Sequence, residues 1–254
     1  MQIDQKYIEV KGNKLWTKTI SPEGAETNSR TIVLLHDALG SIEQWKDYPS
    51  RLAAATNRPV FLYDRFGHGK SDELKWKYDQ NYFEIEAQEV LPEVLRLVKI
   101  ENPIIYGHSD GGTIALIYGS KHLAAALILE ASHVLSEKLT RKGVLGMASL
   151  KPNIVDALRK YHGMRSEMLF DRWYDLWSGT RMKDWNIEKK LMQIDCPVLI
   201  IQGENDNYAT TDQVNRIASG VTGRNLILMM KNSGHHPHKD EPEMLLKEIA
   251  EFIQ

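Results

Sequence analysis

The sequence is short of cysteine, of long apolar runs and of clustered basic charge. Its single cysteine, Cys196, excludes an internal disulfide, and its place before Pro197 at the start of an apolar segment is typical of a buried, unreactive thiol. The first residues, Met1 to Lys6, are polar and lack the apolar core of a signal peptide. Because no apolar run is long enough to span a bilayer, we expect a cytoplasmic protein.

The charges are nearly balanced. Lys and Arg together number 32 and Asp and Glu together number 34, which leaves a net charge of -2. This balance predicts binding neither to nucleic acid nor to a membrane surface. The 254 residues suffice for one large α/β domain or two smaller ones, and they give no indication of the oligomeric state.

Apolar and helix-like segments alternate along most of the chain. Strands buried on both faces of a parallel sheet are predicted where the apolar runs are continuous, at Thr31–Leu35, Arg58–Asp64, Ile104–Tyr106, Ala125–Glu130, Pro197–Ile201 and Asn225–Met230. Helices are expected at Ile42–Ala55 with a break near Pro49, at Tyr82–Val98 with a kink near Pro92, at Asp110–Lys121, after a cap at Thr211 or Asp212, and from Asp240–Pro242 onward. A β-hairpin with Lys11-Gly12 in its turn comes first, followed by a polar loop at Ser21–Ser29. This order predicts right-handed βαβ units and an α/β fold with a mostly parallel, doubly wound sheet.

Residues 133–190 interrupt this alternation. They show no strand pattern, and they contain Trp173 and Trp177, which are four positions apart and so share one helix face. A long helical excursion between two sheet strands predicts a lid inserted into one core domain, which residues 1–132 and 191–254 then form. The two tryptophans either line a substrate cavity beneath the lid or pack the lid onto the core, which is the commoner fate of an aromatic stripe.

The sequence around Ser109 has the pattern of an activated nucleophile. It reads Gly107-x-Ser109-x-Gly111 with Gly112 next, between an apolar run and a helix-like run. Such a strand–turn–helix exposes the serine hydroxyl at a sharp turn, and the free N–H groups of the following helix point at the place where negative charge develops in acyl transfer. The pattern also occurs by chance, so it needs an acid and a histidine elsewhere in the chain.

Both partners follow in the required order. His235, His236 and His238 lie after the last predicted strand, where a base for Ser109 is needed. Asp206 lies beyond the preceding strand and can orient the histidine. Glu130, at the end of another strand, is a second candidate for the acid; its simpler interpretation is a carboxylate hydrogen-bonded at a strand end.

Two further features lie near the carboxyl ends of the predicted strands. The loop that begins at His36 should reach the same edge of the sheet as Ser109 and supply a backbone N–H from Ala38 to an oxyanion hole, unless it is a plain strand–helix turn. The cluster His235, His236 and His238 resembles a set of metal ligands. Adjacent histidines point in different directions and no second cluster completes a site, so we predict no bound metal.

With these motifs the chain resembles the α/β-hydrolase fold superfamily, in its lid-bearing serine esterase-like branch, from about Val10 to the end. The matching segments are Leu34–His36, Asp64–Ser71, Gly107–Gly112, Gly203–Asp206 and Ser233–Pro237 with Glu241-Pro242. The resemblance implies His235 as the base and the N–H groups of Ala38 and Asp110 as the oxyanion donors. Asp37 departs from the glycine usual at its position and is expected to need unusual backbone geometry. Dehalogenases and epoxide hydrolases of this superfamily use an aspartate nucleophile, so Ser109 argues against both.

We therefore predict a carboxylesterase that hydrolyses small to medium apolar esters through an acyl-Ser109 intermediate, without a cofactor. Its expected partner is a small-molecule ester. The same triad also supports C–C bond hydrolysis, lyase chemistry and cofactor-free oxidation, and a non-enzymatic ligand receptor is a further alternative.

Overall fold

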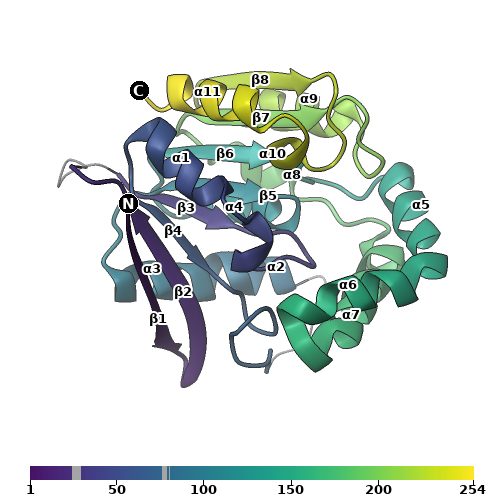
Figure 1. Cartoon of the computed structure of the whole chain (residues 1–254). Coiled ribbons are helices and arrows are strands. Elements are labelled where there is room, and N and C mark those ends of the chain that lie inside the picture. The colour runs from purple at the N-terminus through teal and green to yellow at the C-terminus, as the bar shows by residue number, and fades with distance from the viewer. Residues whose placement is uncertain (25–29, 76–78, 80) are drawn as a thin grey trace.

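The computed structural model describes residues 1–24, 30–75, 79 and 81–254. Their strands form one eight-stranded sheet in the order β1-β2-β4-β3-β5-β6-β7-β8 (Figure 1). The strands are β1 (Gln2–Val10), β2 (Asn13–Ser21), β3 (Ile32–Leu35), β4 (Val60–Tyr63), β5 (Ile104–His108), β6 (Ala126–Glu130), β7 (Val198–Gly203) and β8 (Asn225–Met230). β3 to β8 run parallel, whereas β1 and β2 form the predicted hairpin and β2 pairs antiparallel with β4. The α/β fold and the mostly parallel sheet are thus confirmed.

The composition of each strand follows its depth in the sheet. Every residue of β3, β4, β5, β6 and β7 is buried, as continuous apolar runs require when helices cover both faces. β1 at one edge is largely exposed and carries charged and amide side chains, which discourage pairing with another chain. The predicted polar loop at Ser21–Ser29 lies partly outside the described residues.

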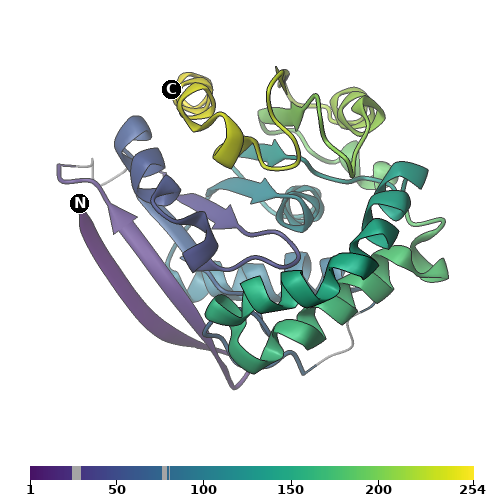
Figure 2. The same ribbon diagram turned by 45° about the vertical axis from the view of Figure 1, so that its right-hand side comes forward.

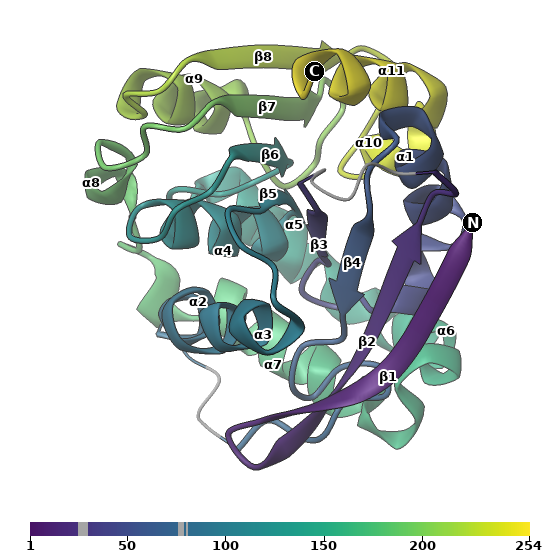
Figure 3. The same ribbon diagram turned by 90° about the vertical axis from the view of Figure 1, so that its left-hand side faces the viewer.

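Helices cover the two faces of the sheet as two layers, which Figure 3 shows from the side. The helices are α1 (Tyr48–Thr56), α2 (Tyr82–Ile85), α3 (Leu91–Val98), α4 (Asp110–Gly119), α5 (Lys138–Gly146), α6 (Lys151–His162), α7 (Ser166–Ser178), α8 (Glu188–Leu191), α9 (Thr211–Gly220), α10 (Pro237–Asp240) and α11 (Pro242–Phe252), with the single turns η1 (Ile42–Trp45), η2 (Glu86–Val90), η3 (Met147–Leu150), η4 (Gly163–Arg165) and η5 (Thr180–Met182). One core lies between the sheet and α1 with α11, and the other between the sheet and α2, α3, α4 and α9. In the described parts of the chain no helix is long and apolar enough to cross a membrane.

One helix prediction is refined and another needs correction. The chain is helical over Tyr82–Val98 as expected, and its irregularity near Pro92 is the π-helical turn η2, which separates α2 from α3. The proline ring clashes with the carbonyl four residues earlier, at Gln88, and the wider turn lies at that residue. The cap of α9 is Thr210 rather than Thr211 or Asp212, and its hydroxyl accepts the N–H of Asp212 at 3.1 Å.

The segment of residues 133–190, called here the helical insertion, leaves the sheet after β6 and returns at β7. Its helices α5, α6 and α7 lie beyond the carboxyl ends of the strands, as Figures 1 and 2 show. α7 packs against both α5 and α6. The insertion therefore stands over the edge of the sheet at which ligands bind in α/β folds.

Candidate active site

Ser109 occupies a strained turn between β5 and α4. Its backbone has φ 54° and ψ -116°, a region that non-glycine residues rarely adopt. A Cβ at Gly107 would lie 2.2 Å from the carbonyl oxygen of Gly111, and one at Gly111 would lie 2.2 Å from that of Leu35. Both positions require glycine because strand and helix pass too close for a side chain. The backbone is thus held in the geometry that presents the Ser109 hydroxyl beyond the sheet.

The structure brings Ser109, His235 and Asp206 together in one chain of hydrogen bonds. His235 Nε2 lies 2.9 Å from Ser109 Oγ, and His235 Nδ1 lies 2.8 Å from Asp206 Oδ2. Two further donors fix the carboxylate, since Gln202 Nε2 donates to Oδ2 at 2.7 Å and the Tyr208 N–H donates to Oδ1 at 2.7 Å. An imidazole held in this way offers an unprotonated Nε2 to the serine hydroxyl.

The electrostatics of the pair suit a general base. Burial alone would raise the pKa of Asp206, but attraction to His235 and their hydrogen bond outweigh it and lower that pKa to about 2. Burial would likewise lower the pKa of His235. The Asp206 carboxylate outweighs this effect and holds the pKa of His235 above its usual value. The imidazolium that forms when His235 takes a proton is therefore stabilised.

Activity at this site is expected to fall as the pH drops through the pKa of His235. Only the neutral imidazole can accept the Ser109 proton, and because the pKa of His235 is raised, the acid limb of kcat/KM should have its midpoint above 6.5. A profile of kcat/KM for an activated ester between about pH 5 and 9 measures this midpoint. A rate that does not change over this range contradicts His235 as the base.

Glu130, the alternative acid, does not reach His235. Its Oε1 accepts both the backbone N–H and the Nδ1–H of His238 at 2.8 Å, and its Oε2 accepts the Tyr106 hydroxyl at 2.7 Å. The carboxylate is fully buried and every contact belongs to the core beneath the site. The interpretation of Glu130 as a hydrogen-bonded carboxylate at a strand end fits this geometry, whereas Asp206 is the carboxylate that contacts His235.

The loop after β3 lies beside Ser109. Asp37 is not among the residues with positive φ, so the expected unusual backbone is wrong. Its Oδ1 instead accepts the Leu39 N–H at 2.9 Å and closes an ordinary turn. The buried Arg65 guanidinium donates to the carbonyl oxygen of Asp37 at 2.7 Å, and His68 Nε2 donates to that of Ala38 at 2.9 Å. These contacts hold Ala38 at the wall of the cavity that Ser109 and Asp110 also line.

A cavity of about 230 Å³ opens at Ser109 and His235. Its apolar wall comes from the helical insertion, with Val144, Met147, Ile154, Leu158, Trp173 and Trp177. The opposite rim is polar, with Asp37, Gln44, His236 and Lys239. Both predicted tryptophans line this cavity, and Trp177 also packs on Phe83 of α2 with ring centroids 6.0 Å apart. Trp177 therefore both lines the cavity and packs the helical insertion onto the core, the two roles that were considered as alternatives.

Sequence reasoning missed His133 as a cavity residue. Its ring is buried between Trp177 and His235, with centroids 5.1 Å and 6.1 Å away, and its Nδ1 has no hydrogen-bond partner in the described structure. Burial lowers its pKa to about 3, so the ring is neutral. It therefore adds a neutral polar group to the lining of the cavity. The feature of the sequence that could have indicated this role is the position of His133, three residues beyond Glu130 at the end of β6.

The side chain of Asp110 also lies in the cavity region. Its buried carboxylate hydrogen-bonds Trp177, and burial raises its pKa to about 6 although Arg65 opposes this rise.

Among the described residues, two groups of three side chains offer converging metal-ligand atoms: Asp37, His108 and His236, and His108, Glu130 and His238.

Comparison with known proteins gives these observations a context. The model of the alpha/beta hydrolase family matches residues 32–248. The proline iminopeptidase of Saccharolobus solfataricus is 25% identical over an alignment that covers 100% of this chain and 93% of the relative. The AB hydrolase superfamily protein YisY of Bacillus subtilis is 26% identical, over 74% of this chain and 79% of its own.

Solved structures of low sequence identity share the fold. The enol-lactonase from Burkholderia xenovorans superimposes with a TM-score of 0.77 at 17% identity, covering 98% of this chain and 99% of its own. An esterase from Exiguobacterium antarcticum gives a TM-score of 0.73 at 18% identity, covering 97% and 98%. At these identities the likeness shows the fold alone.

Proposed function

Since this chain belongs to the alpha/beta hydrolase family, we propose that it is a serine esterase that cleaves small to medium apolar carboxylic esters. The hydrogen-bonded chain of Ser109, His235 and Asp206 at the base of an apolar-walled cavity carries this proposal. The helical insertion acts as the lid of that cavity, with residues 1–132 and 191–254 as the core domain.

The reaction follows from the positions of these groups. His235 Nε2 takes the proton of the Ser109 hydroxyl while Ser109 Oγ attacks the carbonyl carbon of the ester. The N–H groups of Ala38 and Asp110 receive the negative charge on the carbonyl oxygen. His235 then gives the proton to the departing alcohol, and water, activated by the same base, releases the acid from Ser109. These steps need no cofactor.

The cavity sets the expected substrate. The insertion supplies branched and aromatic side chains and Met147, whose flexible thioether adapts to different shapes. An apolar acyl chain fits against this wall, and the polar rim suits the leaving alcohol. The triad itself does not select an ester over an amide or an activated C–C bond, because the leaving group is chosen by the pocket.

We expect the purified protein to turn over p-nitrophenyl esters with an optimum at medium acyl length. The longer chain gains about 0.8 kcal/mol for each buried methylene until the cavity is full, so kcat/KM should rise from acetate and then fall. A series of esters measured by p-nitrophenol release gives this optimum. A proline arylamide and a ring-fission diketone in the same assay test amide and C–C cleavage.

The competing outcomes are distinct. Turnover of acetyl or charged acyl esters alone contradicts the apolar acyl site. Preference for the arylamide or the diketone replaces the esterase with a peptidase or a C–C hydrolase on the same triad. Binding of an ester-like ligand without turnover favours a receptor.

A further inference from the structure

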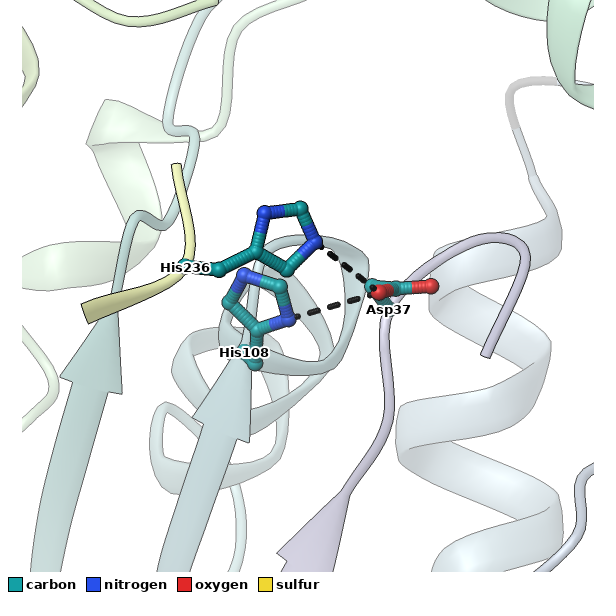
Figure 4. Close-up of side chains that lie close together, drawn as sticks. All are labelled: Asp37, His108 and His236. Atoms are coloured by element: carbon teal, nitrogen blue, oxygen red, sulfur yellow. Dashed lines mark ion pairs between the residues drawn. The ribbon is translucent and has the colours of Figure 1, made fainter. Parts of the chain in front are cut away.

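The end of one strand and two loops bring Asp37, His108 and His236 face to face at the carboxyl edge of the sheet (Figure 4). Asp37 follows β3, His108 ends β5 one residue before the nucleophile, and His236 follows β8 beside the catalytic base. A single carboxylate oxygen, Asp37 Oδ2, faces both rings. It lies 3.5 Å from His108 Nδ1 and 3.8 Å from His236 Nε2.

These separations are long for hydrogen bonds and suit ligands of one ion. Direct N–H···O bonds span about 2.7–3.2 Å. Nitrogen and oxygen ligands about 2.0–2.1 Å from a tetrahedral Zn²⁺ lie about 3.4 Å from one another. The three donor atoms all lie within 4.8 Å of one another, so one ion between them can reach all three with small side-chain adjustments.

The groups around these atoms are arranged as in metal sites. His108 Nε2 lies 2.7 Å from the carbonyl oxygen of His235, which can only accept, so Nε2 carries the proton. Because the proton is on Nε2, Nδ1 presents its lone pair on the side of the ring that faces the Asp37 carboxylate. Asp37 Oδ1 is already bonded to the Leu39 N–H, which leaves Oδ2 available. A metal-binding histidine typically donates its other N–H to a backbone carbonyl, and a binding carboxylate is held by a hydrogen bond in the same way.

We propose that Asp37 Oδ2, His108 Nδ1 and His236 Nε2 form a site for one divalent transition-metal ion of the Zn²⁺ type. From sequence no metal was expected, because no second group of ligands was seen beside the histidine cluster; the sheet order brings Asp37 and His108 to His236 and supplies that group. Two neutral imidazoles and one carboxylate are a ligand set that Zn²⁺ accepts, with a fourth position open to water. The side chains of Asp37 and His236 are 23% and 37% exposed and line the cavity rim, so the ion enters from solvent. None of the three ligands belongs to the proposed triad, and the site does not depend on the esterase proposal.

Two neighbouring histidines, His238 and His162, are already bound to other groups. In the second group of ligand atoms, Glu130 already binds His238 and Tyr106 directly, which leaves no gap for an ion. The ring nitrogens of His162 contact the Gly69 N–H and the Leu39 carbonyl oxygen. The exposed Lys239 at the cavity rim opposes a cation, although its long side chain can turn into solvent.

Titration of the chelator-treated full-length protein with Co²⁺ tests the site. We expect visible absorption bands of four-coordinate cobalt that saturate at one ion per chain and disappear on addition of one equivalent of Zn²⁺. Zn²⁺ should also raise the melting temperature, because it joins two loops to the end of β5. His236→Ala and Asp37→Asn should each weaken binding by about 100-fold or more. His122→Ala, on the loop after α4, is the matched control and should bind as the wild type does.

Each contrary result has one meaning. Failure of the wild-type protein to bind Co²⁺ shows that Asp37 and the two histidines form only an ion pair. Equal binding by the wild type and by His236→Ala shows adventitious binding elsewhere. If Asp37→Asn unfolds, the half-exposed His236→Ala alone decides, with circular dichroism as the check of its fold.

Discussion

Ser109→Ala is expected to lower kcat for ester hydrolysis by about 10⁵–10⁶-fold while leaving the fold unchanged. The substitution removes only Oγ, and the Cβ that remains keeps the contacts of the turn, so the strained φ of 54° is as tolerable for alanine as for serine. Residual turnover comes from substrate binding and the proposed oxyanion donors. The measurement is kcat for the best ester of the series, with the melting temperature as the check of folding.

Covalent labelling makes this expectation specific. A fluorophosphonate should modify the wild-type protein at Ser109 alone, located by mass spectrometry of the labelled peptide, and should not modify Ser109→Ala. Ser178→Ala is the control, because that hydroxyl only bonds the Tyr174 carbonyl in the helical insertion. Full turnover in Ser109→Ala contradicts the mechanism. If the folded wild-type protein is not labelled, the result favours a ligand receptor or a lid that is closed over the site.

Asp206→Asn is expected to reduce kcat by about 10⁴-fold. The amide donates where the carboxylate accepts, so His235 takes the wrong tautomer and presents an N–H to Ser109. The hydrogen bond from the Tyr208 N–H to Oδ1 survives, which keeps the loop in place. Steady-state kinetics of the variant on the same ester measure the loss.

Glu130→Gln is the matched comparison, since it is also an acid-to-amide change at a strand end. It should retain most of the turnover, because Glu130 contacts His238 and Tyr106 rather than His235. It should instead destabilise the protein by about 2 kcal/mol through the weakened buried hydrogen bonds, as measured by urea unfolding. If Glu130→Gln damages turnover more than Asp206→Asn does, the acid has been assigned to the wrong residue.

The features predicted from sequence are those with local causes. Strands such as β3 and β5 are continuous apolar runs, and burial on both faces allows no other pattern. The turn at Ser109 is predicted by its flanking glycines, Gly107 and Gly111, because neighbouring backbone passes too close to both positions for a side chain. The expected resemblance to the α/β-hydrolase superfamily is confirmed by the family match, whereas its esterase branch stays a prediction.

The features that were missed depend on partners far away in the chain. Glu86 reads as part of a charged surface helix, yet it is fully buried and burial raises its pKa to about 7, with Arg65 opposing this rise. His108 and Asp37 are 71 positions apart in sequence, so only the sheet order that makes β3 and β5 neighbours places them together. No local pattern encodes such a pairing, because it arises from the topology and not from the period of a helix or strand.

The distance along the chain between the members of the proposed triad has a consequence for biosynthesis. Ser109 and His235 are separated by 126 positions, and β6, the helical insertion, β7 and β8 lie between them. A nascent chain that ends before His235 contains Ser109 but has no base to activate it. Contacts of such long sequence separation form late because closing the loop between them is slow. During refolding, turnover of the ester should therefore return later than the circular-dichroism signal of the helices. A nascent chain still on the ribosome should not hydrolyse esters.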